Sequence, residues 1–136
     1  MKSFRHFIRE SIDATAGVGF GEGDNAQSYR FKVSDLIKHA EQKHESGEDR
    51  YPVQHIDPQS MADNIESRKG SESKEEEIRR TKSANVSYPI IATHRPDGSG
   101  LQILDGTHRL GRAIEDRHKT IPVRIIPLQH LEKFKV

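Results

Sequence analysis

The stretch LQILDGTHRLGRAIED, residues 101–116, constrains the fold of this chain more than any other segment. Its first residues are apolar and predict a short strand that ends at Asp105-Gly106, because glycine adopts backbone angles that other residues resist. Thr107 is placed to cap the amino terminus of a following helix. The apolar residues of that helix recur at helical spacing and form one face: Leu110, Ala113 and Ile114. The stretch therefore predicts a strand, a tight turn and an amphipathic helix.

The first turn of the expected helix carries two basic side chains, His108 and Arg109. A helix amino terminus offers unpaired backbone N–H groups and the positive end of the helix dipole, and basic side chains add further positive charge. The local chemistry fits a phosphate-binding site, and it also fits a plain strand–turn–helix corner with a solvated polar first turn. The phosphate-binding hypothesis comprises Asp105, Gly106, Thr107, His108, Arg109 and Arg112.

Residues 105–113, DGTHRLGRA, together with IPVRII at 121–126, resemble the signature of the ParB/sulfiredoxin superfamily. Further matches to strands of that family occur at 53–58 and 88–93. The resemblance implies an α/β (α+β) fold with a small mixed sheet and flanking helices. It also implies a nucleoside triphosphate pocket at the helix start, with ATP or CTP and Mg²⁺ as the expected ligands.

In this family, residues just after the first strand take part in catalysis, and kinase-like members place a glutamate there. This chain has DPQS at residues 57–60, with no glutamate. The resemblance therefore implies His108 and Asp57 as catalytic residues, with Asp63 as the other carboxylate that could take the role of the missing glutamate. A serine-kinase type of reaction is not expected.

Two branches of the family do not fit. Sulfinic acid reduction needs a cysteine before the His-Arg pair, where this chain has Thr107, and the chain contains no cysteine. Centromere-binding members need a helix-turn-helix domain after the pocket, and the chain ends soon after its last family-like strand, so we do not expect centromere binding.

Two classes of function remain. The first is a nucleotide-dependent phosphotransferase or hydrolase, including the nuclease activity assigned to some ParB-like members. The second is a non-catalytic binding module that acts on a host protein or nucleic acid. The net charge of +1 gives no overall case for nucleic-acid binding. The eight histidines are scattered, so no metal site is expected. No apolar run is long enough to span a bilayer, so no membrane partner is expected.

Residues 1–10 form a second informative segment, because Phe4, Phe7 and Ile8 predict an amphipathic helix. This helix could dock on the core. The segment also resembles the capsid-targeting peptide of internal head proteins in large tailed phages, in which a prohead protease cuts after an [LI]-x-E triplet. Ile8-Arg9-Glu10 fits that triplet, so Glu10 is the expected processing residue. The resemblance implies a protein of the phage head interior that later enters the host cytoplasm; otherwise we expect a cytoplasmic protein.

The remaining organisation follows from composition. Residues 11–30 contain Gly-x-Gly-x-Gly-x-Gly and predict a flexible linker. Residues 31–136 are expected to form the folded domain, which opens with a helix capped by Ser34. A charged insertion at about residues 60–84 is expected to be a solvated helix or a loop.

Overall fold

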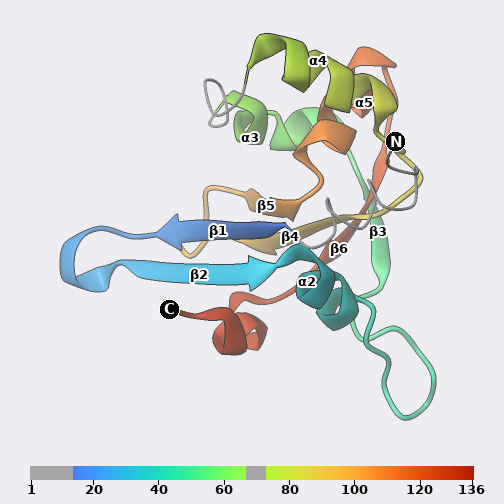
Figure 1. Cartoon of the computed structure of the whole chain (residues 1–136). Helices are drawn as coiled ribbons and strands as arrows, with labels where there is room; N and C mark the ends of the chain where they lie inside the picture. The colour runs from blue at the N-terminus through green and yellow to red at the C-terminus, as the bar shows by residue number, and fades with distance from the viewer. Residues whose placement is uncertain (1–13, 67–72) are drawn as a thin grey trace, which may run out of the picture.

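The computed structural model describes residues 14–66 and 73–136 of the chain. Its centre is a four-stranded sheet in the order β3 (Val53–Ile56), β6 (Ile121–Ile125), β4 (Ile90–His94) and β5 (Leu101–Asp105) (Figure 1). β6 is parallel to β4, whereas β3 and β5 are antiparallel to their neighbours. The prediction of a small mixed sheet in an α+β fold is confirmed.

The connections explain these strand directions. A short turn joins β4 to β5, with the Arg95 amide donating to the Gly100 carbonyl at 2.9 Å, so the two strands form an antiparallel hairpin. Helix α5 (Thr107–Glu115) then carries the chain across β4 to β6. The end of β5 and the starts of β4 and β6 consequently meet at one end of the sheet. We call this the α5 end of the sheet.

One face of the sheet is covered by the hairpin of β1 (Thr15–Phe20) and β2 (Gln27–Lys32), by α2 (Val33–Ala40) and by the short helix η3 (Leu128–Phe134). A single 3-10 turn, η1 (Gly23–Asn25), connects the two strands of the hairpin. Together these elements enclose one apolar cluster with the sheet. Its buried members are Tyr29, Phe31, Leu36, Ala40, Tyr51, Ile91, Leu104, Ile126, Leu131 and Phe134.

The linker predicted over residues 11–30 is wrong for the described part of that segment. Residues 15–20 and 27–32 pair as an antiparallel hairpin. Ala16, Val18 and Phe20 alternate with residues that face solvent, and they pack against the cluster below. Gly17 and Gly19 therefore occupy the outward face of β1, where side chains are not needed for burial. The helix cap predicted at Ser34 is also wrong, because the N-cap of α2 is Lys32, two residues earlier.

The opposite face of the sheet is covered by η2 (Pro58–Met61), α3 (Asp63–Glu66) and α5. The second apolar cluster lies under these helices, and its buried members are Met61, Ile90, Ala92, Ile103, Leu110, Ala113, Ile121 and Val123. Figure 1 shows this group of helices on one side of the sheet and α2 with η3 on the other. The sheet is thus the middle layer of three.

The charged insertion forms helices rather than an open loop in its described part. α4 (Lys74–Ser83) begins with Ser73, whose hydroxyl accepts from the Glu76 amide at 3.2 Å. α4 packs on α5 at a point where Gly111 faces the side chain of Thr81. Its Ile78 is 46% exposed, so α4 is held by close backbone approach and polar contacts rather than by an apolar face.

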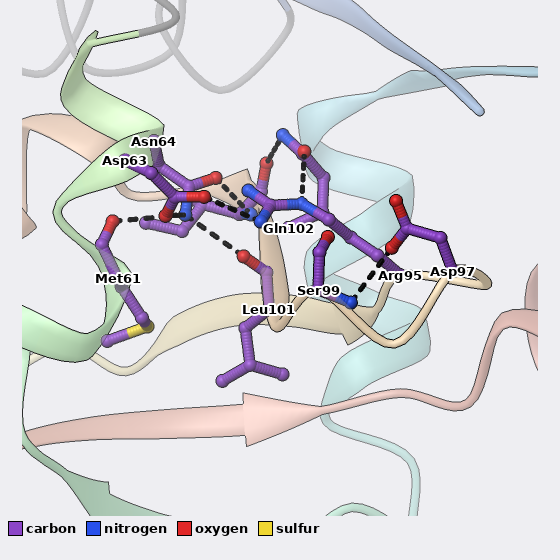
Figure 2. A network of polar contacts seen from close by, with 9 residues as sticks. Met61, Asp63, Asn64, Arg95, Asp97, Ser99, Leu101 and Gln102 are labelled. Atoms are coloured by element: carbon purple, nitrogen blue, oxygen red, sulfur yellow. Dashed lines mark hydrogen bonds and ion pairs between the residues drawn. The ribbon is translucent and has the colours of Figure 1, made fainter. Parts of the chain in front are cut away.

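Asn64 closes the open edge of the sheet at β5. Its side chain is 2% exposed, and its Oδ1 accepts from the Ile103 amide at 2.9 Å. Its Nδ2 donates to the carbonyls of Leu101, at 3.0 Å, and Met61, at 3.1 Å (Figure 2). The amide side chain thereby pairs with an edge strand as a neighbouring strand would, and it leaves less backbone for a foreign strand to pair with.

In the described part of the chain, no helix combines the length and the apolar character that crossing a bilayer requires.

A buried histidine, His39, lies on the side of α2 that packs against Phe134 of η3. The ring of His39 packs against the rings of Tyr51 and Phe134, at centroid distances of 5.8 and 5.7 Å. Neither ring nitrogen has a hydrogen-bond partner among the described residues. Burial lowers the pKa of His39, and the positive charge of Lys133 lowers it further. A contact with the main chain of His130 acts on this pKa in the opposite direction but does not reach hydrogen-bond geometry.

We expect the free energy of unfolding to fall as the pH is lowered below about 6.5, because the unfolded chain then binds a proton that folded His39 resists. Thermal unfolding between pH 8 and pH 5 measures this. His39→Phe should flatten the profile because it keeps an aromatic ring and removes the titrating group. The matched exposed variant His44→Phe should keep the wild-type profile. Equal pH profiles for wild type and His39→Phe would contradict the assignment.

Candidate functional site

The candidate site lies where β5 passes into α5, at the α5 end of the sheet. Gly106 is the residue of the turn, and its φ of 114° lies in the region that favours glycine. A Cβ at this position would lie 3.0 Å from Cγ1 of Ile90 and 3.3 Å from Cζ of Arg109. Both the backbone angle and the close approach therefore require glycine. This tight turn brings the start of α5 against the start of β4.

The helix cap differs from the prediction. Thr107 was expected to be the N-cap, but Gly106 is the N-cap and Thr107 is the first helical residue. The Gly106 carbonyl accepts from the Leu110 amide at 3.0 Å, which closes the first turn. Glycine has no side chain, so the N-cap residue gives no side-chain cap to the amide groups of the first turn. Amide groups at a helix start without such a cap are suited to bind an anion.

Arg109 is bound by the protein itself. Its Nη2 lies 2.6 Å from Oδ2 of Asp105, and both side chains are 19% exposed. Its Nη1 donates to the Pro89 carbonyl at 2.5 Å and lies 3.5 Å from the Tyr88 carbonyl. One guanidinium thus joins the end of β5, the start of α5 and the segment that leads into β4. We call this arrangement the Arg109 clamp.

Arg112 is also held by the protein. Its Nε donates to Oδ2 of Asp116 at 2.7 Å, and its Nη1 donates to the Lys82 carbonyl at the end of α4. The hydrogen bond to Asp116, together with the charge of that carboxylate, raises the pKa of Arg112. The guanidinium therefore fastens α4 to α5.

These contacts change the predicted roles of three phosphate-binding residues. The donors of Arg109 and Arg112 have protein acceptors, and the carboxylate of Asp105 holds an arginine. Thr107 and His108 lie half-buried in the first turn of α5, as predicted. A phosphate at this site would therefore meet the backbone amides of the first turn and the Thr107 side chain rather than the two guanidinium groups.

Asp57, the second predicted catalytic residue, follows β3 at the same end of the sheet. Two strands, β6 and β4, separate β3 from β5. The Asp57 carboxylate accepts from the Gln59 amide at 2.9 Å and caps η2. The local structure gives Asp57 a capping role, and nothing in its contacts directs it toward His108.

Arg95 and Asp63 lie away from the site. Because β4 and β5 are antiparallel, Arg95 follows β4 at the end of the sheet opposite to α5. Its Nη1 lies 2.6 Å from Oδ2 of Asp63, and its Nε donates to Gln102 at 3.2 Å (Figure 2). This network ties α3 to the β4–β5 hairpin. Neither residue takes part in the phosphate-binding site.

A cavity that the sequence did not reveal adjoins the Arg109 clamp. Its volume is about 510 Å³, and Pro89, whose carbonyl accepts from Arg109, forms part of its wall. Two imidazoles, two hydroxyl-bearing side chains and several apolar side chains line it. The polar members are His55, Ser87, His118 and Thr120. They come from separate parts of the chain. Predicting that they line one cavity requires the knowledge that β4 and β6 begin at the same end of the sheet.

The described residues contain no group of three or more His, Asp or Glu side chains arranged to hold a metal ion. Glu10, the predicted processing residue, lies outside the described residues.

Comparisons of the chain with protein-family models, with curated proteins and with solved structures found no match. The site is therefore interpreted from its own geometry.

Replacing Arg109 by methionine should destabilise the fold by about 2–3 kcal/mol, because a half-buried carboxylate and a carbonyl lose their donor. Chemical denaturation measures this. Asp105→Asn in the same chain should recover part of the loss, since it removes the unpaired charge. The exposed pair of Arg79 and Glu76 offers a control, and Arg79→Met should cost less than about 1 kcal/mol. Equal losses in the free energy of unfolding for Arg79→Met and Arg109→Met would show that the clamp stabilises the fold no more than an exposed ion pair does.

Proposed function

We propose that the domain binds a nucleoside triphosphate, with its phosphates at the amino terminus of α5, as the resemblance to ParB/sulfiredoxin-like proteins implies. One observation carries the proposal: α5 begins at a glycine in the left-handed region, with no side-chain cap on its first turn. Amide groups in that position attract anions through hydrogen bonds and the helix dipole.

Two further features support the proposal. His108 lies in the first turn and supplies a basic side chain beside the amides. The cavity next to the Arg109 clamp, of about 510 Å³, falls within the range of small-molecule sites and offers ring and hydroxyl groups to the rest of a nucleotide. The Arg109 clamp then acts as a positioning device, since it fixes the turn and the cavity wall relative to each other.

The proposal concerns binding first. A phosphotransfer or hydrolysis reaction would use His108 as the group next to the phosphates, and Mg²⁺ would be bound through the phosphate oxygens. The carboxylate proposed from the sequence, Asp57, caps η2 instead. A binding module without turnover is therefore the simpler form of the proposal, and a reaction would be an added property of the same site.

The test is nucleotide binding by Thr107→Glu. A carboxylate at the helix start interacts favourably with the positive end of the helix dipole, so the variant should fold with unchanged or higher stability. The same carboxylate would repel a phosphate, so affinity for ATP, CTP or inorganic triphosphate should fall by about tenfold or more. Gln42→Glu, which adds one equal charge on the α2–β3 connection, is the control. Isothermal titration calorimetry with and without Mg²⁺ measures the affinity.

For the wild type, a ligand at about a hundred times its dissociation constant should raise the free energy of unfolding by roughly 2.7 kcal/mol. The absence of binding for all three ligands would overturn the proposal. Unchanged affinity in Thr107→Glu would show that the triphosphate binds at another place on the molecule. Release of inorganic phosphate from a bound nucleotide would add turnover to binding.

A further inference from the structure

A positively charged surface lies on the face of the molecule opposite to α5. Arg30 and Lys32 on β2, Lys38 on α2 and Lys133 in η3 surround one groove of about 470 Å³. All four side chains are exposed. Asp35 is the one carboxylate in the wall of this groove. We call this surface the hairpin groove. It concentrates positive charge in a chain whose net charge is only +1.

Within residues 14–66 and 73–136, the four cations form no ion pair with a carboxylate. The ammonium of Lys133 stands 5.0 Å from the centre of the Phe134 ring, which leaves its hydrogen-bond donors toward the groove or solvent. Cations that are gathered without internal neutralisation provide a local field for an anionic partner.

The strand beside these cations is bare of large side chains on its outer face. In the β1–β2 register, Gly17 lies opposite Arg30, Thr15 opposite Lys32 and Gly19 opposite Ser28. The outer face of β1 therefore carries two glycines and one threonine, while β2 carries the charge. Glycine in a strand interior weakens the strand, and it is often found where a ligand or another backbone approaches closely. Because the side chains on the outer face of β1 are small, they leave the cations of β2 accessible from the side of β1.

The composition of the groove favours a nucleic acid over a protein partner. Protein interfaces are built around aromatic and aliphatic anchors and are depleted in lysine. In the hairpin groove three of the four cations are lysines, and the rings of Phe31 and Phe134 are only 5% and 8% exposed. A protein partner would find little apolar surface to bury. A phosphate backbone needs only positive charge and hydrogen-bond donors.

The size of the groove favours a single strand. The cations come from three elements around one groove of about 470 Å³, a space that a single chain of phosphates can occupy. Exposed aromatic rings that would stack with bases do not line it. Contact with the backbone alone predicts binding that is independent of sequence and strongly dependent on salt.

We infer that the hairpin groove binds the phosphate backbone of a single-stranded nucleic acid through Arg30, Lys32, Lys38 and Lys133. This site lies on the opposite face of the central sheet from the proposed nucleotide site at α5. The two sites share no residue, so an experiment can refute this inference without refuting the proposed nucleotide site, and the reverse also holds.

The test uses the full chain and a fluorescent oligodeoxythymidylate of about 20 nucleotides, with fluorescence anisotropy as the readout. For single strands, the logarithm of the affinity falls with the logarithm of the salt concentration by about 0.7 per phosphate neutralised. Four cations therefore predict a slope of about 3. The variant Arg30→Gln/Lys32→Gln/Lys38→Gln should lower the slope to about 1 and weaken binding at least about tenfold at low salt. Lys133 is left unchanged because it contacts the Phe134 ring.

The matched control removes three exposed lysines elsewhere, in Lys74→Gln/Lys82→Gln/Lys119→Gln, and should leave the slope near the wild-type value. A second variant, Thr15→Glu, keeps every cation and places a carboxylate opposite Lys32. It should lower the slope by about 0.7, the contribution of one neutralised phosphate. The inference is overturned if the oligonucleotide does not bind at low salt or if both triple variants lose binding equally. Tighter binding of polyglutamate than of the oligonucleotide would also overturn it, in favour of an acidic protein partner.

Discussion

The arrangement of the candidate site depends on one ion pair, between Arg109 and Asp105. The carboxylate ends β5, the guanidinium begins α5, and the same guanidinium binds the carbonyl of Pro89 just before β4. A bidentate donor such as arginine can hold two acceptors in a fixed geometry, which lysine cannot do. β5 pairs with β4 as far as Asp105, which lies opposite Ile91, and the clamp adds a side-chain link between the start of α5 and the segment before β4. Strand, turn, helix and cavity wall are therefore positioned by one side chain.

The clamp also decides which groups are left for a ligand. An Arg at the start of a helix is expected to bind phosphate, yet here its charge is balanced by a neighbour only four residues away. Arg112 is balanced in the same way and fastens α4. The helix start presents its amide groups and Thr107, with His108 in the same turn. A pocket that relies on amides and a helix dipole favours anions without carrying a large positive charge, which agrees with the nearly neutral composition of the chain.

The sequence predicted the local elements well and their partners poorly. The alternation of apolar residues and the Asp-Gly turn were enough to place β5 and α5, because periodicity and turn chemistry are local properties. The hairpin of β1 and β2 was missed because its glycines suggested a linker, although Ala16, Val18 and Phe20 already alternated toward a core. The sequence does not identify the partners of Arg109, since Pro89 is distant in sequence and an aspartate before a helix start is equally suited to bind a ligand. The cavity beside Pro89 required the strand order, which the sequence does not contain.

The central claim is that the uncapped start of α5 binds phosphate while the Arg109 clamp stays closed. Nuclear magnetic resonance tests this most directly, by following the backbone amides and the Arg109 guanidinium signal during a titration with triphosphate or ATP. The account predicts that the amide signals of Thr107, His108 and Arg109 shift with saturation, while the guanidinium signal of Arg109 keeps its position. Amide signals that do not shift, or shifts confined to other parts of the chain, would contradict the claim.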